Sequence, residues 1–303
     1  MGGIAWARWA DGADFTPTTT ASGTPLRWAG GCVFLRPHVA GTLDVPGALE
    51  TALATATAAW ETPTRSCSYL DFQIEPAEAG EVGHDFINRI IVREDRWCRP
   101  GTPERCYDAG AVAITTVVFV DDPGDPRDGT ILDVDIELNA VNFALATCDG
   151  QPGGCTSGGD GPRQDLANIL THELGHLVGL DHTCWAGFGT QPRDGNNEPV
   201  PPCQPANELP ASVVEATMFN FASPEEVIKR TPEADDVDGF CSRYPLASDP
   251  GTCEPVPAPL DAEVTLSTGG GGGCCSSSSA VPPLWLVLGV AVIQATLRRI
   301  RRS

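Results

Sequence analysis

The clearest periodicity in the chain is a strict alternation of apolar and acidic residues from Ile131 to Leu138. Leucine, valine and isoleucine occupy every second position, and Asp133, Asp135 and Glu137 lie between them. Because successive side chains of a strand point to opposite faces of the sheet, this alternation predicts a strand with one buried face. Shorter β-branched or aromatic runs predict further strands at 24–36, 69–74, 87–93 and 111–120.

Three segments carry apolar residues at helical spacing. Residues 47–61 are alanine-rich, and their larger apolar side chains recur every three or four positions, which predicts a helix. Residues 163–178 carry an apolar stripe, follow an Asp-Gly-Pro cap at 160–162 and end at Gly179, so a second helix is expected there. A last helix is expected over 233–244.

Composition divides the chain into five parts. They are an N-terminal extension (1–23), a globular domain (24–249), a Pro/Gly/Ser-rich linker (250–279), an uncharged apolar segment (280–297) and a basic tail (298–303). The apolar segment has nearly the minimum length for crossing a bilayer, so we expect a transmembrane helix with its arginines on the cytoplasmic side. A buried core helix is the alternative.

Twelve cysteines are many for a cytosolic chain, so export is expected. Ten of them precede residue 264, an even number that permits complete pairing. The short loops favour the pairs Cys98–Cys106, Cys148–Cys155 and Cys184–Cys203. Cys32 with Cys67 and Cys241 with Cys253 would then remain, although spacing alone leaves the connectivity open.

Two further features bear on location and partners. Residues 1–20 lack the apolar core of a secretory signal, so export implies either a different start or a leader before Met1. The formal net charge is −21, and an acidic surface repels phosphate backbones. A nucleic-acid partner is therefore not expected. We expect the protein to be a monomer.

The strongest chemical signal is the sequence HELGHLVGLDH, which runs from His172 to His182. In a helix, His172 and His176 lie one turn apart on the same face, so both imidazoles can reach one ion at about 2.0 to 2.1 Å. A positive φ at Gly179 would reverse the chain and bring His182 to the same ion. Three neutral imidazoles leave one tetrahedral position open, as in catalytic zinc sites, and Glu173 lies beside it.

This motif, with Thr183, Met218 and the Asp235-Asp236 pair, resembles the metzincin metalloproteases and, among them, the matrixins. The resemblance implies an α+β fold in which a twisted mixed β-sheet packs against a zinc-binding active-site helix and a C-terminal helix. It also implies a methionine turn beneath the zinc at Met218, supported by the helix that carries the Asp-Asp pair.

The resemblance further implies a zinc-dependent endopeptidase acting on protein or peptide substrates. His172, His176 and His182 would bind zinc, and Glu173 would take a proton from the attacking water and deliver it to the leaving amine. A catalytically idle, zinc-stabilised surface binding module is the alternative from another class. A pappalysin-like metzincin shares the zinc motif and is the third possibility.

The sequence also departs from the matrixins. It has no further histidine cluster for a second zinc and no propeptide cysteine motif; we expect His38 and His84 to be ordinary surface or loop histidines. Asp133, Asp135 and the acidic loop 121–128 could hold calcium, although solvated carboxylates explain them more simply.

The C-terminal region resembles the sorting tails of myxobacterial surface proteins, which combine a cysteine-containing Gly/Ser motif, an apolar span and an arginine cluster. That resemblance implies processing at Cys274 or Cys275. The expected location is therefore the cell surface of a bacterium, with membrane anchoring through the C-terminus, or release to the extracellular space.

Overall fold

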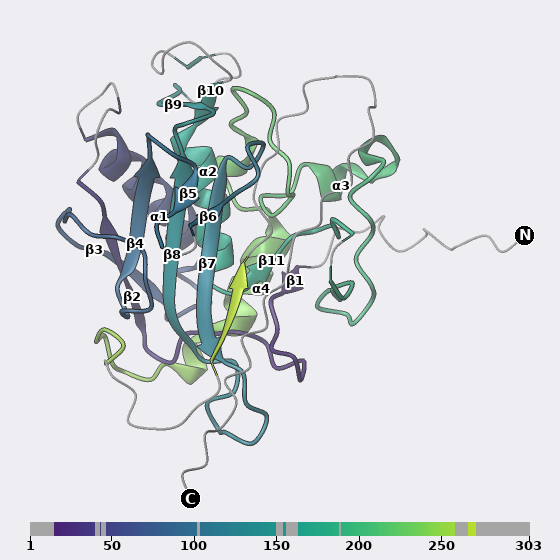
Figure 1. Ribbon diagram of the computed structural model, residues 1–303. Coiled ribbons are helices and arrows are strands. Elements are labelled where there is room, and N and C mark those ends of the chain that lie inside the picture. Colours follow the sequence, from purple (N-terminus) through teal and green to yellow (C-terminus); the bar gives the residue numbers. More distant parts are fainter. Residues whose placement is uncertain are drawn as a thin grey trace, which may run out of the picture.

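The structure, a computed structural model, describes residues 15–39, 43, 47–101, 104–149, 154–155, 163–187, 189–257 and 266–270 (Figure 1). Its centre is a six-stranded sheet with the strand order β12-β7-β8-β4-β2-β3. The strands are β2 (Cys32–Pro37), β3 (Asp71–Ile74), β4 (Asn88–Arg93), β7 (Ala113–Val120), β8 (Ile131–Asn139) and β12 (Leu266–Gly270). All the strands predicted from alternation and β-branched runs are present within the predicted ranges or one residue of them.

The sheet is mixed, and its connections correct the predicted α+β class. Strands β3, β2, β4 and β8 are mutually parallel, whereas β7 runs antiparallel to β8 and β12 antiparallel to β7. Helix α1 (Ala48–Thr64) joins the parallel neighbours β2 and β3. Parallel strands require such a crossover, so the domain is of the α/β type.

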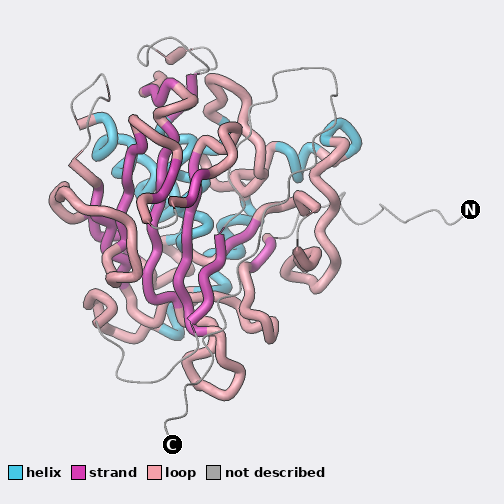
Figure 2. Tube along the Cα trace, in the orientation of Figure 1, coloured by secondary structure: helices cyan, strands magenta, loops and turns pink. Residues whose placement is uncertain are grey.

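Helices α1, α2 (Leu166–Leu177) and α4 (Ala234–Arg243) form where helical spacing predicted them, and they lie together on one face of the sheet (Figure 2). Trp60 of α1 joins the three, because its indole N–H donates to Thr171 O of α2 over 2.8 Å and its ring stacks on Phe240 of α4. The described residues also form the short helix α3 (Ala211–Val214) and 3₁₀ turns at Ala206–Glu208, Ile228–Arg230 and Leu246–Ser248.

Short strand pairs frame this centre. β1 (Thr16–Pro17) pairs with β11 (Leu180–Asp181), β5 (Cys98–Arg99) with β6 (Arg105–Cys106), and β9 (Ala144–Ala146) with β10 (Arg163–Asp165). Strand β10 occupies the start of the predicted second helix. The side chain of Asp165 therefore caps α2 by accepting from Asn168 N, and the predicted cap at 160–162 lies outside the described residues.

Strand β8 is buried on both faces, so the prediction of a strand with a single buried face was wrong. Val134, Ile136 and Leu138 join the core with the helices. Asp133 and Asp135 are also buried, because residues 83–89 fold over the opposite face of the sheet. The alternating pattern was correct, but a covering segment replaces solvent.

The covering segment meets the two aspartates with backbone donors. Asp135 accepts from the N–H groups of Gly83 and Arg89, at 2.9 and 3.2 Å, and Asp133 accepts from Asp85 N at 3.1 Å. A calcium ion would have to contact the same carboxylate oxygens that accept these N–H groups. We therefore do not propose calcium on this part of β8.

Glu137 ends the acidic row in a cluster of ion pairs. Its carboxylate lies 2.6 Å from the guanidinium nitrogens of both Arg93 and Arg99, and it accepts a hydrogen bond from the hydroxyl of Tyr107 at 2.8 Å. Glu137 itself is fully buried. The cluster ties β8 to β4 and to the segment containing the β5–β6 hairpin, which crosses this face of the sheet (Figure 1).

All ten cysteines that precede residue 264 form disulfides. The three short-loop pairs are confirmed, but the other four cysteines pair as Cys32–Cys253 and Cys67–Cys241. Cys32–Cys253 links the start of the domain to its end, where Gly31 N donates to Thr252 O, and Cys67–Cys241 links the end of α1 to α4. Spacing could not reveal this return of the chain. Five disulfides are expected only in an oxidising environment.

The C-terminal region corrects the predicted architecture in a second way. No helix among the described residues is long and apolar enough to cross a membrane, so the fold as described has no transmembrane helix. The predicted span at 280–297, with Cys274 and Cys275, lies outside those residues. Within the predicted linker, residues 266–270 form β12 at the edge of the sheet instead of a flexible segment.

Candidate metal centre

Helix α2 is buried along its whole length, and its close packing requires a glycine in the middle. A Cβ on Gly175 would lie 2.2 Å from the sulfur of Met218 and 3.2 Å from Trp60. Met218 therefore packs directly beneath the helix turn that carries the histidines. This position agrees with the methionine turn that the matrixin resemblance implied; the part played by Gly175 was not predicted.

The structure brings the three predicted histidines together. The Nε2 atoms of His172 and His176 are 3.1 Å apart, as are those of His176 and His182. Two ligand atoms held about 2.0 to 2.1 Å from one tetrahedral ion are separated by about 3.3 Å. The spacing of the imidazole nitrogens therefore fits a shared metal ion.

Backbone carbonyls orient two of the rings from behind. Nδ1 of His172 lies 2.5 Å from Thr217 O, and Nδ1 of His176 lies 2.8 Å from Leu180 O. A carbonyl can only accept, so each Nδ1 carries the hydrogen and each Nε2 presents its lone pair to the common point. Such second contacts fix both tautomer and ring direction at metal sites.

Gly179 makes the turn that returns His182 to the helix. Its φ is +89°, as predicted, and a Cβ there would meet Leu26 O at 2.6 Å. Strand β11 follows at once and pairs with β1, which holds the reversed chain in place. His182 is thereby fixed beside α2 by both backbone conformation and strand pairing.

Burial keeps two of the ligand imidazoles neutral. Removal from solvent, reinforced by the neighbouring imidazoles, holds the pKa of His172 and of His182 well below the ordinary value. A neutral imidazole is the form that binds a metal ion, because a protonated Nε2 has no lone pair to offer. His172 and His182 therefore each offer a metal-ready nitrogen at neutral pH.

Glu173 is fully buried next to these rings and is held from the sheet. The hydroxyl of Thr115 on β7 donates to its Oε2 over 2.5 Å. Thr115 was not singled out by sequence reasoning, because a lone threonine within a predicted strand carries no motif. The only available signal was a polar residue among the apolar positions that face the helices.

Helix α4 supports the centre through Thr217. The carboxylate of Asp236 accepts from Glu233 N at the start of α4, and Thr217, whose carbonyl orients His172, lies close enough to lower the pKa of this carboxylate. Burial and repulsion by Asp235 raise the pKa of Asp236 to about 8. The Asp-Asp segment is therefore connected to the metal ligands by one intervening residue.

Other groups in the described part of the chain do not offer a comparable site. Cys98, Glu104 and Cys106 lie close together, but both sulfurs belong to one disulfide. His38 and His84, which we expected to be ordinary surface or loop histidines, belong to no potential metal-binding group among the described residues.

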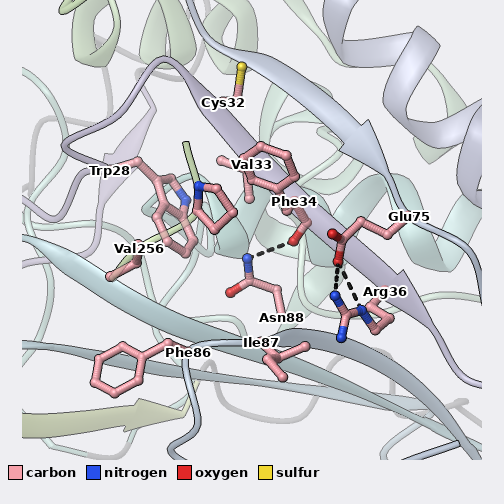
Figure 3. Close-up of a pocket in the computed structure, with 11 residues that line it drawn as sticks. Trp28, Cys32, Val33, Phe34, Arg36, Glu75, Phe86, Ile87, Asn88 and Val256 are labelled. Carbon is pink, nitrogen blue, oxygen red and sulfur yellow. Dashed lines mark hydrogen bonds and ion pairs between the residues drawn. The ribbon is translucent and has the colours of Figure 1, made fainter. Parts of the chain in front are cut away.

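The polar side chains Asn88 and Arg36 in a pocket beside β2 already have protein partners. Figure 3 shows Asn88 and Arg36 at its wall, and both are engaged: the Asn88 amide donates to Phe34 O and the Arg36 guanidinium pairs with Glu75. The remaining lining includes Trp28 and other apolar side chains. We assign it no function.

Comparison with known proteins adds no assignment. No protein-family model matches the chain, and no curated protein matches its sequence. A group of three buried histidines that could hold a metal ion, compatible with zinc, is what the structure itself provides.

Proposed function

We propose that the protein is a zinc-dependent endopeptidase. The observation that carries this proposal is the convergence of three imidazole Nε2 atoms beside a buried glutamate. Three protein nitrogens leave the fourth tetrahedral position free for water or substrate, which distinguishes catalytic from structural zinc sites. The resemblance of the histidine motif to metzincins supports peptide hydrolysis as the reaction.

When bound, zinc supplies a Lewis acid that polarises a carbonyl and makes water more acidic. His172, His176 and His182 hold it, with two of the rings oriented by backbone carbonyls. Glu173 takes the proton from the attacking water and returns it to the leaving amine. Its burial excludes bulk water, which would otherwise compete for its carboxylate.

An idle, zinc-stabilised binding module would need the histidines but not the glutamate. Glu173 is present and receives a hydrogen bond from a different element of the fold. This arrangement favours an enzyme over a structural zinc site. The five disulfides also support action outside the reducing cytosol, so we propose that the enzyme is exported.

The direct test is incubation of the purified, oxidised protein with a diverse peptide library, analysed by mass spectrometry. Cleavage that stops with a zinc chelator and resumes on addition of zinc is the expected result. Zinc-loaded Glu173→Gln serves as the matched control, because it keeps all three ligands. A zinc-loaded wild-type protein that cleaves no peptide would exclude the proposed activity and leave the binding module.

A further inference from the structure

We infer that Thr115 is a positioning residue that sets the orientation of the Glu173 carboxylate; this inference rests on the proposed function. The contact joins residues 58 positions apart, one on β7 and the other on α2. Both side chains are almost completely buried, Thr115 at 1% and Glu173 at 0% exposure. Bulk water therefore cannot replace the hydroxyl as a donor.

A polar side chain is unusual on the strand face that Thr115 occupies. Ala113 and Val117, two positions before and after it, belong to the apolar core. Thr116 points to the opposite face, where its hydroxyl accepts from Arg99 at 3.1 Å. A hydroxyl among core positions is costly unless it is hydrogen-bonded, and Glu173 is the partner that the fold supplies to Thr115.

The geometry defines what the contact does. The hydroxyl engages Oε2, so it limits rotation of the carboxylate about its terminal bond. A terminal carboxylate torsion is otherwise broad and roughly two-fold, so packing of the aliphatic stem alone does not set it. A group that transfers a proton must lie within hydrogen-bond reach of its target. The orientation of the Glu173 carboxylate therefore affects the rate of the reaction.

The test compares Thr115→Val, which removes the hydroxyl at nearly constant volume, with Thr115→Ser, which keeps it. For the zinc-loaded protein we expect Thr115→Val to lower kcat by about 10- to 100-fold with KM within about two-fold. Thr115→Ser should recover most of the loss. Thr64→Val is the matched control, because it removes a buried hydroxyl whose bond, to Trp60 O, stays within α1, and should leave kcat unchanged.

Two readouts separate positioning from a general loss of structure. Because Thr115 acts through Glu173, adding Thr115→Val to Glu173→Gln should lower kcat no further. Crystal structures of the metal-free variants should show one Glu173 carboxylate orientation in the wild type and Thr115→Ser, and an altered or multiple orientation in Thr115→Val. If Thr115→Val does not fold, Thr115→Ala and Thr115→Ser carry the same comparison.

The outcomes also separate this inference from the proposed function. Equal kcat in the wild type and Thr115→Val, or an unchanged Glu173 orientation in the variant structure, would overturn the role of Thr115 while Glu173→Gln stays inactive. A serine variant as slow as the valine variant would overturn it as well. A zinc-loaded wild type without peptidase activity would instead remove the proposed function.

Discussion

The two sides of the central sheet show opposite solutions to the burial of polar groups. On the helical side of the sheet, three imidazoles converge with their Nε2 atoms directed at one point. On the other side, Asp133, Asp135 and Glu137 are each met by backbone N–H groups or guanidinium groups.

The difference teaches how a buried cluster can be recognised as a binding site. Charges inside a protein need partners, and when the fold supplies them the cluster is complete without a ligand. The acidic row is satisfied largely in this way. The histidine cluster presents lone pairs to a shared point, an arrangement that fits a bound metal ion.

The largest expected effect is on the histidine side. Zinc-loaded Glu173→Gln should lose about 10²- to 10⁴-fold in kcat, because general acid–base catalysis contributes about that much, while its zinc content stays at the wild-type level. Steady-state kinetics together with elemental analysis measure both quantities. Near-wild-type turnover would mean that another group accepts the proton.

The matching change on the acidic side should affect stability and not chemistry. Glu137→Ala leaves Arg93 and Arg99, at 10% and 15% side-chain exposure, without their shared carboxylate. Removal of one partner from a buried ion cluster costs about 3 to 5 kcal/mol, which urea unfolding measures. Zinc affinity of the folded fraction should not change. A variant as stable as wild type would show that solvent reaches these arginines.

The packing beneath the histidines gives a smaller effect. Gly175→Ala places a methyl group 2.2 Å from the sulfur of Met218, so Met218 must move. Overpacking of this kind costs about 1 to 3 kcal/mol, and we expect weaker zinc binding in addition. Competition with a chromophoric chelator measures the affinity. Met218→Ala in the same background should relieve the clash, and failure to do so would contradict the assigned contact.

The smallest effect concerns pH. Burial and repulsion by Asp135 raise the pKa of Asp133 to about 7, and burial raises that of Asp135 to about 7. Both values exceed that of an unfolded aspartate, about 3.9, so the folded state binds the extra protons. Stability should therefore be greatest below about pH 4 as far as this pair is concerned, and should fall as pH rises toward 7.

Asp133→Asn removes one of the two titrating groups and should flatten that profile. We expect the variant to gain about 1 to 2 kcal/mol over wild type at pH 8 and nothing near pH 4, as measured by urea unfolding across pH. Asp95→Asn, a change at an exposed bend, is the control. A constant offset at all pH values would contradict the assignment of the slope to Asp133.

Sequence reasoning reached the histidine site because its determinants are local. Helix geometry fixes the relative positions of His172, Glu173 and His176. Gly179 predicts the turn that brings His182 back toward them. The acidic row was misjudged because its burial depends on a covering segment some 50 residues away in the chain. Alternation reveals that a strand has two kinds of face, but not what covers the second face.

The same distinction explains the other differences. Cys32 and Cys253 meet only because the chain returns to its starting point, and short-loop spacing carries no trace of that return. Thr115 contributes through a contact between a strand and a helix, which a one-dimensional pattern does not encode. Contacts within one element or one turn were predictable, whereas contacts between distant elements required the fold.

The central claim is that the three converging imidazoles bind zinc, and metal analysis of the folded protein tests it most directly. Oxidised, monodisperse protein reconstituted with zinc and then desalted should contain one zinc per chain, and His182→Ala should retain much less at the same free zinc concentration. Folded wild-type protein that retains no zinc or other transition metal after reconstitution would contradict the account.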